Sequence, residues 1–324
     1  MLYVAGIDIG STYTKAIVLN DRREVVGTAV RRTGFKLAQA AEAAFEELLK
    51  SSGLERAAVA YVAATGYGRY TVPFRNTQLT ELTAHARAAV HLFPETRTIL
   101  DIGGQDIKAI KIDADGRVKA FRLNDKCAAG TGAFLEKTAR YLGLTTDDLG
   151  PYALRATKPV QISSVCAVFA ESEVINHLSN GIPAEDIVMG AMQALGGRAI
   201  QLMRRVGIEP GYMLTGGMTR NAAMVSALES SLKAKFHVGS GVLGQLNGAY
   251  GAALLGLRRV EKLLAEGKPI PPTAAQQVPG ESVSVRRWSA KSLTPRQIEP
   301  CRTTGACPIT TQPAAKPLEQ AARV

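Results

Sequence analysis

The sequence predicts an α/β protein built of two related lobes, and three observations support that prediction. Strand-like and helix-like stretches alternate along the chain, as expected for sheets that are covered by helices. A pattern with a tight glycine turn occurs twice, beginning at Asp8 and again at Asp101. A third glycine turn, Gly216-Gly217, follows a later apolar strand. The length of 324 residues allows two domains that each bury a core.

The repeated pattern predicts the strands of both lobes. Residues 8–17 read D-I-G-S-T-Y-T-K-A-I and residues 101–110 read D-I-G-G-Q-D-I-K-A-I, and each copy continues through an apolar stretch to a charged turn. The second of these charged turns, D-A-D-G, is typical of a hairpin. We therefore expect strand, glycine turn, strand, turn and strand in each copy. After the first copy, residues 36–51 predict a helix and residues 57–66 predict a further strand.

The two repeated glycine turns are candidate phosphate loops. Without a side chain, glycine lets backbone N–H groups approach a phosphate closely, and the aspartate at each strand end suits Mg²⁺ bound through water. One such turn is a weak signal, because a glycine hairpin with an exposed aspartate is common. Two copies predict two lobes that each offer a loop to one nucleotide. The third turn, in M-L-T-G-G-M-T-R-N (213–221), precedes a helix from about Asn221 and suits a base or ribose that lies against the backbone.

In this order, the three turns resemble those of the ASKHA superfamily, which includes acetate and sugar kinases, Hsp70 and actin. The resemblance implies two ribonuclease-H-like lobes of the actin, Hsp70 and acetate-kinase type, with a cleft between them for ATP and Mg²⁺. It implies a first lobe over residues 1–95, completed by a helix at about 247–264, and a second lobe over residues 96–246 with Cys127 and Cys166. The catalytic carboxylates that it implies are Asp8 and Asp101. The nucleotide-binding residues that it implies are Gly10, Ser11, Thr12, Lys15, Gly103, Gly104, Gln105, Gly216, Gly217, Met218 and Gln245.

The four cysteines, Cys127, Cys166, Cys301 and Cys307, are too few for a disulfide scaffold. Cys127 and Cys166 each follow a short polar segment and precede an amphipathic stretch, and a helix N-terminus at that point stabilises a thiolate. Two small buried cysteines are the alternative, because burial is the most common fate of a free cysteine. A cubane iron–sulfur cluster requires four thiolates, and a symmetric dimer with two such cysteines per chain would supply them.

Longer motifs resemble one family closely, the ATPase components of 2-hydroxyacyl-CoA dehydratases and of ATP-dependent benzoyl-CoA reductases. The motifs are N-D-K-C-A-A-G-T-G-x-F-L, I-S-S-x-C-x-V-F-A-E-S-E-V-I, A-T-G-Y-G-R and T-G-G, and the resemblance covers residues 3–257. It implies an electron activator with one [4Fe–4S] cluster per dimer, bound by Cys127 and Cys166 of both subunits. One electron would arrive from ferredoxin or flavodoxin, and ATP binding and hydrolysis would change the angle between the cluster helices. The electron would then pass to the catalytic subunits of a CoA-ester reductase or dehydratase.

Two roles within this family stay open, together with one outside it. The stretches H-A-R-A-A-V-H-L (85–92) and F-L-E-K-T-A-R-Y-L-G-L (134–144) favour a stable benzoyl-CoA reductase subunit, in which the second ATPase chain is either a copy or a paralogue. The alternative is a transient activator of a 2-hydroxyacyl-CoA dehydratase, which the intact N-D-K-C-A-A-G-T-G motif suits equally. The competing class is a cluster-free ASKHA kinase of a small metabolite, which would be colourless when it is prepared without air.

Composition adds expectations about partners and location. Hydrophobic residues make up 46% and charged residues 21% of the chain, which is ordinary for a globular protein, and no apolar run approaches the ~18 residues of a membrane span. The first ten residues contain no basic region, so we expect no signal peptide and a cytoplasmic protein. The net charge of +11 indicates a basic tail or an acidic partner; without zinc-finger spacing or an RNA-binding signature we expect no nucleic-acid partner. Residues 265–324 predict a disordered, proline-rich basic tail, or alternatively a docking arm for the catalytic partner.

Overall fold

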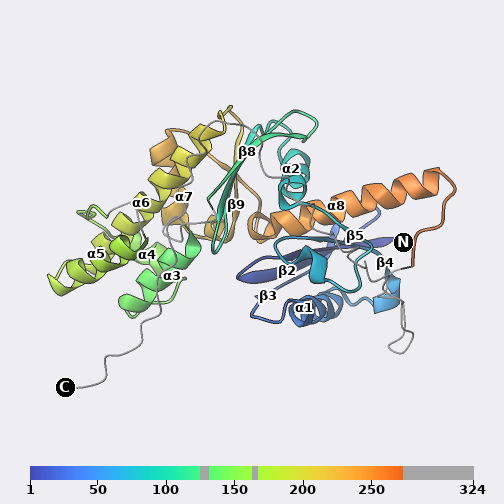
Figure 1. Ribbon diagram of the computed structural model, residues 1–324, viewed down its shortest axis with the longest axis horizontal. Coiled ribbons are helices and arrows are strands. Elements are labelled where there is room, and N and C mark those ends of the chain that lie inside the picture. The colour runs from blue at the N-terminus through green and yellow to red at the C-terminus, as the bar shows by residue number, and fades with distance from the viewer. Residues whose placement is uncertain (125–130, 163–166, 273–324) are drawn as a thin grey trace, which may run out of the picture. The chain divides into compact units, whose positions relative to one another are not determined.

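Figure 1 shows the protein as a computed structural model, in which residues 1–124, 131–162 and 167–272 are described. The described residues form two five-stranded sheets with helices packed on them. The chain divides into a unit of Met1–Pro279, which holds all the described residues, and a unit of Gly280–Val324, which lies outside them. All four cysteines and most of the predicted tail also lie outside the described residues.

The first sheet comes from the N-terminal part of the chain and has the strand order β3-β2-β1-β4-β5. β1, β2 and β3 are antiparallel neighbours, whereas β4 runs parallel to β1 and β5 runs parallel to β4. The helix predicted over residues 36–51 is confirmed as α1, which packs against β2 and β3. The bounds are β1 Tyr3–Ile9, β2 Tyr13–Asn20, β3 Val25–Arg32, α1 Leu37–Ser52, η1 Arg56–Ala58, β4 Val59–Thr65, η2 Arg69–Thr71 and β5 Thr77–Gln78.

The second sheet repeats this topology, with the strand order β10-β9-β6-β7-β8. β6, β7 and β8 are antiparallel neighbours, β9 runs parallel to β6, and β10 runs parallel to β9. The repeated glycine turn therefore marks the same hairpin, at the start of each sheet. The bounds are β6 Thr98–Ile102, β7 Ile107–Ile112, β8 Val118–Asn124, α3 Gly132–Tyr141, α4 Leu149–Ala153, α5 Ala167–Ser179, α6 Ala184–Arg205, β9 Tyr212–Gly216, η4 Gly217–Arg220, α7 Ala222–Leu232 and β10 His237–Val238.

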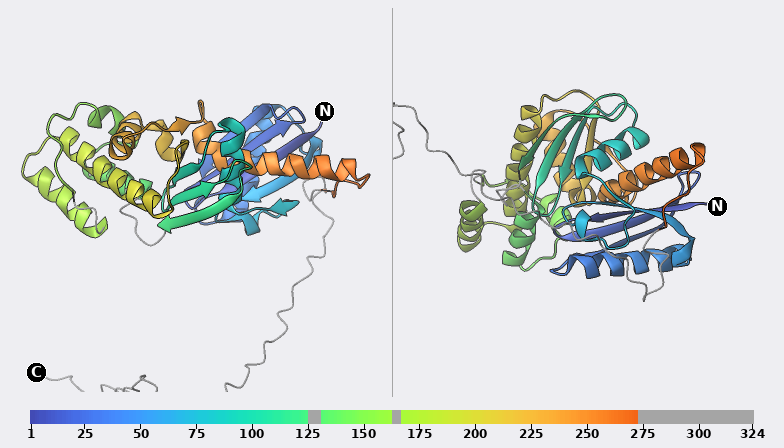
Figure 2. Two further views of the ribbon diagram at one scale, coloured as in Figure 1. Left: turned by 90° about the horizontal axis from the view of Figure 1, so that it is seen from above. Right: turned by 45° about the vertical axis from the view of Figure 1, so that its right-hand side comes forward.

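Two helices, α2 (Glu81–Leu92) and α8 (Leu243–Ala265), connect the sheets (Figure 2). α8 packs on β1, β2 and β4 and also contacts β9, whereas α2 packs on α8 and contacts β6, β7 and β8. The two helices approach closely because glycine stands at their crossing: a Cβ on Gly251 would lie 1.8 Å from the carbonyl oxygen of Ala84. α8 covers the helix expected at about 247–264 and begins earlier in the chain. The predicted lobe boundaries stay predictions.

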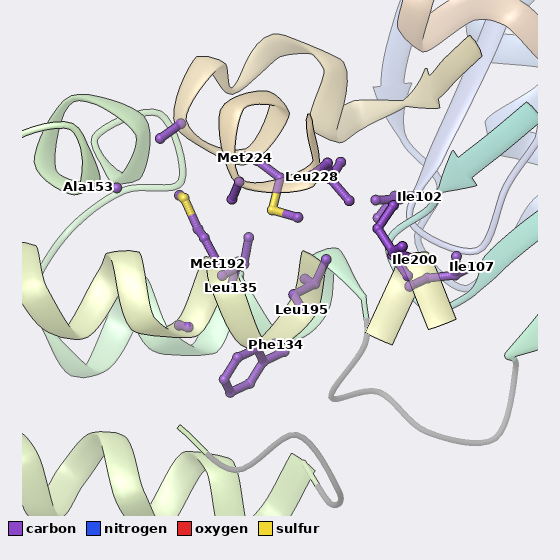
Figure 3. Close-up of a cluster of buried hydrophobic side chains, with 14 of the residues drawn as sticks. Ile102, Ile107, Phe134, Leu135, Ala153, Met192, Leu195, Ile200, Met224 and Leu228 are labelled. Atoms are coloured by element: carbon purple, nitrogen blue, oxygen red, sulfur yellow. The ribbon is translucent and has the colours of Figure 1, made fainter. Parts of the chain in front are cut away.

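Each sheet has its own hydrophobic core. In the first, α1 packs Phe45 and Leu48 against the strands. In the second, side chains from α3, α6 and α7, among them Phe134, Met192 and Leu228, meet on the sheet (Figure 3). Full burial of one such side chain contributes about 1.5–3 kcal/mol, so these cores hold β1 and β6 firmly where each strand ends in its glycine turn. No described helix is long and apolar enough to cross a membrane.

Candidate nucleotide site

The first glycine turn joins β1 to β2, and its register places Asp8 directly opposite Lys15. Lys15 Nζ lies 3.0 Å from Asp8 Oδ2, and both side chains are largely buried. Burial would lower the pKa of Lys15, but the negative charges of Asp8 and Asp101 outweigh burial and raise it. A Cβ on Gly10 would lie 3.5 Å from Lys15 Nζ. Lys15 is therefore a fixed cation beside the turn, where a phosphate would need one.

The second glycine turn joins β6 to β7, and the same register places Asp101 opposite Lys108. Lys108 Nζ lies 3.6 Å from Asp101 Oδ2, 2.5 Å from Asp106 Oδ2 and 2.9 Å from Glu81 Oε2. Burial would lower the pKa of Lys108, but these carboxylates outweigh burial and raise it. The D-I-G-x-x-x-x-K pattern thus has a physical reason, because its aspartate and lysine are cross-strand neighbours in a hairpin. Lys108 was not among the predicted site residues, although the sequence repeat contains it.

The repeat extends to a third strand in each sheet. Asp8 pairs with Thr65 of β4, and Asp101 pairs with Thr215 of β9. A glycine with positive φ follows each threonine: φ is 89° at Gly66 and 96° at Gly216. A Cβ on Gly66 would lie only 2.4 Å from Asp8 Oδ1, so a larger residue would displace the carboxylate. Both T-G pairs were visible in the sequence, but their pairing with the aspartates depends on strand order.

The two aspartates differ in their hydrogen bonds. Thr215 Oγ1 donates to Asp101 Oδ1 at 2.8 Å, whereas Thr65 Oγ1 donates to the carbonyl oxygen of Leu79 at 3.1 Å. Burial would raise the pKa of Asp101, but His85, Lys108 and the Thr215 hydroxyl outweigh burial and lower it to about 2. Asp101 is therefore ionised at neutral pH although its side chain is buried.

The two predicted phosphate loops lie against each other. A Cβ on Gly104 would stand 2.1 Å from Thr12 Oγ1, so only glycine fits at that position. Thr33 holds the first loop, because its Oγ1 donates to the Gly10 carbonyl oxygen at 2.8 Å and its backbone N–H donates to the Thr12 carbonyl oxygen at 2.9 Å. In the loops Ser11 and Gln105 are exposed. The structure thus brings the residues of both turns together.

The second loop is also the docking point of α3. The backbone N–H groups of Gly132 and Ala133 donate to the carbonyl oxygens of Gly103 and Gly104, at 3.1 Å and 2.8 Å. These are the first two residues of α3, the helix that follows Cys127 in the chain. A movement of the second loop would therefore move the start of α3.

The third glycine turn lies beside the second loop, because Gly216 pairs with Ile102 at the end of β6. Among the described residues no atom lies within 4 Å of a Cβ built on Gly217, so this backbone has an open face of the kind that a flat base or ribose would need. Met218 follows in η4, which α8 contacts. Gln245 lies in the first turn of α8 and is nearly buried. The residues expected around the adenosine, Gly216, Gly217 and Met218, therefore lie in elements that contact α8, which carries the predicted nucleotide residue Gln245.

A buried polar cluster that was not predicted from the sequence adjoins Asp101. The Nδ1 atom of His85 in α2 lies 3.2 Å from Thr215 Oγ1 of β9 and 3.0 Å from Asn247 Nδ2 of α8. Residues 85–92 were considered only for their family resemblance. No local pattern identifies such a group, because its members come from three distant parts of the chain.

The residues expected to bind the cluster, Cys127 and Cys166, lie outside the described residues, as do Cys301 and Cys307. The helices that follow the first two cysteines, α3 and α5, contact each other. Glu171 of α5 joins them, with Lys137 Nζ 2.8 Å from its Oε1 and with Tyr141 OH donating to its Oε2 at 3.3 Å. Within the described ranges, no group of three His, Cys, Asp or Glu side chains could hold a metal ion. Two thiols per chain ahead of two adjoining helices fit half of a four-thiolate site.

Comparison with known proteins places the chain among ATPases. It matches the BadF/BadG/BcrA/BcrD ATPase family over residues 5–256. It is 41% identical over 261 residues to the activator of lactoyl-CoA dehydratase of Anaerotignum propionicum, an alignment that covers 81% of this chain and 100% of that protein. It is 38% identical over 283 residues to a benzoyl-CoA reductase subunit from Thauera aromatica, covering 83% of this chain and 98% of that one.

A solved structure gives the same result. The activator of the 2-hydroxyisocaproyl-CoA dehydratase from Clostridium difficile, with bound ADPNP, superposes with a TM-score of 0.78 at 38% identity, covering 83% of this chain and 100% of that one. This match confirms the predicted fold class of two ribonuclease-H-like lobes. The chain belongs to the BadF/BadG/BcrA/BcrD ATPase family, as its motifs predicted.

Proposed function

We propose that this protein is the ATP-hydrolysing activator of a 2-hydroxyacyl-CoA dehydratase. The observation that carries the proposal is the 41% identity over the full length of the lactoyl-CoA dehydratase activator. The comparisons support this role better than the benzoyl-CoA reductase role that the sequence alone favoured. The reductase role stays as a second candidate because of the 38% identity to the Thauera aromatica protein. A cluster-free metabolite kinase has less support, because both relatives are named for CoA-ester dehydration or reduction.

The nucleotide would bind where the three glycine turns meet. Backbone N–H groups of the turns at Gly10 and Gly103 would face its phosphates, with Lys15 supplying a positive charge. Asp8 is already paired with Lys15 at 3.0 Å, and Asp101 accepts from Thr215 at 2.8 Å. Carboxylates that are held in this way fit Mg²⁺ bound through its water molecules, because Mg²⁺ retains several waters in most protein sites.

Three contacts would carry a change in the nucleotide to the helices after the cysteines. The second loop holds the start of α3 through the hydrogen bonds at Gly132 and Ala133. Arg32, next to the Thr33 that holds the first loop, lies 3.5 Å from Glu136 of α3. Glu171 then joins α3 to α5. Both loops are therefore linked to both helices through residues that the structure describes.

The cluster would be held by Cys127 and Cys166 of two subunits, and when bound it would store one electron at low potential. Large apolar side chains stand exposed on α5, namely Phe169 at 65%, Ile175 at 44% and Leu178 at 40%. Exposed apolar groups of this size commonly mark protein–protein contacts. They support a second subunit that covers α5. Ferredoxin or flavodoxin as the donor follows from the family resemblance alone.

The test is a reconstitution without air. The purified protein, reduced ferredoxin and MgATP are mixed with the catalytic component of lactoyl-CoA dehydratase at a large molar excess over the activator. We expect lactoyl-CoA to be dehydrated although the activator is present at far less than one molecule per molecule of the catalytic component. A parallel reaction offers benzoyl-CoA and the catalytic subunits of a benzoyl-CoA reductase. Ring reduction there, with no dehydratase activation, would replace the proposed role with the reductase role.

A further inference from the structure

The imidazole of His85 is a buried polar group that the proposed nucleotide contacts do not use. Its residue is 6% exposed and lies in α2 among the buried alanines of that helix. A buried polar group without hydrogen bonds costs free energy, so each nitrogen atom of the His85 ring is expected to have a hydrogen-bond partner. The ring joins α2 to three other elements, through Asn247 of α8, Thr215 of β9 and Asp101 of β6.

The hydrogen bonds around Nδ1 determine where the ring carries its proton. Thr215 Oγ1 donates its single hydrogen to Asp101 Oδ1, so it cannot also donate to His85 Nδ1, 3.2 Å away. Asn247 Nδ2 lies 3.0 Å from Nδ1 and 3.4 Å from the His85 carbonyl oxygen, which can only accept. The amide N–H groups therefore face the ring, and Nδ1 accepts. A ring that accepts at Nδ1 carries its only proton on Nε2.

His85 Nε2 lies near the carboxylates of both Asp101 and Asp8. It lies 3.9 Å from Asp101 Oδ2, which is too long for a direct hydrogen bond. A Cβ on Gly248 would stand 3.3 Å from Nε2 and 2.9 Å from Asp8 Oδ2, so both atoms face α8 at this glycine, where a side chain would crowd them. Asn247 Oδ1 is buried as well and has no hydrogen-bond partner among the described residues. Two polar groups of this cluster therefore remain available to a small polar molecule.

We propose that His85 is a positioning residue of the ATPase site, which donates from Nε2 to a water molecule that bridges it to the carboxylates of Asp101 and Asp8. One donor and two acceptors match the hydrogen-bonding capacity of a water molecule, and buried waters typically have about three polar partners. A metal ion does not fit next to an N–H donor. The bridge would keep the carboxylates of the two lobes in one relative orientation while the nucleotide reacts. This inference rests on the proposed function, since it concerns the same ATPase.

Two variants with amide side chains distinguish the role of Nε2 from the role of Nδ1. The amide nitrogen of His85→Gln can take the place of Nε2, whereas His85→Asn can only offer a group at the place of Nδ1. We expect His85→Asn to lower kcat for MgATP hydrolysis about 10- to 100-fold, the usual loss for an outer-shell partner, with KM for ATP changed by less than about twofold. We expect His85→Gln to retain kcat within about threefold of the parent.

Under this proposal, the thermal stability of the two variants does not follow the order of their kcat values. His85→Asn keeps an acceptor for Asn247 and should be at least as stable as His85→Gln. Activity that follows stability, with His85→Asn the more active variant, would overturn the proposal and leave His85 a structural residue. Equal kcat values in the two variants would overturn it too. The ATPase assay needs no dehydratase, so this result stands apart from the reconstitution that tests the proposed function.

Discussion

Replacing Thr215 by valine tests the difference between the two lobes. Thr215→Val keeps the shape of a fully buried side chain and removes the hydroxyl that donates to Asp101 at 2.8 Å. Thr65→Val is the matched control, because this hydroxyl is equally buried but donates to the neutral carbonyl oxygen of Leu79. A hydrogen bond to a charged group contributes about 1.5–3 kcal/mol, and one between neutral groups about 0.5–1.5 kcal/mol. We expect Thr215→Val to lose roughly 1 kcal/mol more unfolding free energy than Thr65→Val near neutral pH.

The pH dependence sharpens this test. The pKa of Asp101 is about 2 in the folded protein, below its ordinary 3.8. A lowered carboxyl pKa stabilises the fold above the unfolded pKa, and this contribution of roughly 2 kcal/mol is lost as the pH falls towards the folded pKa. Because Thr215→Val raises the pKa of Asp101, the gap between the variants should be constant between about pH 7 and 5 and narrow below about pH 4. Urea unfolding followed by circular dichroism, with EDTA present, measures the gap. Equal losses at every pH would refute the hydrogen-bond assignment.

Three further predictions follow from the site. Asp8→Asn and Asp101→Asn should each lower MgATP hydrolysis by about 100-fold or more without changing the iron content, because a carboxylate is removed where transition-state charge is stabilised; parental ATPase rates in both would contradict the phosphate-loop assignment. Cys127→Ser or Cys166→Ser should abolish the visible absorbance of the anaerobic protein and leave ATP binding intact, and a full iron content would falsify the cluster assignment. Arg32→Ala should change the unfolding free energy by less than about 1 kcal/mol, because the Arg32 side chain is exposed, yet reduce dehydratase activation per ATP hydrolysed; unchanged coupling would exclude this contact from the pathway.

Local patterns predicted those parts of the fold that depend on neighbouring residues. The D-I-G-x-x-x-x-K repeat predicted two equivalent hairpins, because the register of a short hairpin is set by its turn. The helix over 36–51 has the periodicity of an amphipathic helix, and it was confirmed at Leu37–Ser52. The strands β5 and β10 have only two residues each, which is too short for any periodic signal.

The contacts that complete the site could not be predicted in the same way. His85 and Asn247 meet only because α2 and α8 cross closely at Gly251, and that crossing joins residues far apart in the chain. Predicting that Thr65 and Thr215 lie beside the two aspartates would have required knowledge of the strand order of both sheets. The roles assigned to the predicted nucleotide residues stay predictions, although the structure places these residues on adjoining turns and helices.

In the proposed function, ATP hydrolysis by this chain drives electron transfer to a CoA-ester dehydratase. The most direct measurement is lactoyl-CoA dehydration by a fixed amount of dehydratase component, started with the reduced activator and either MgATP or the non-hydrolysable analogue ADPNP. We expect many dehydratase turnovers per activator with MgATP, none with ADPNP, and none with Cys127→Ser under either condition. Equal activation by ADPNP, or activation by Cys127→Ser, would contradict it.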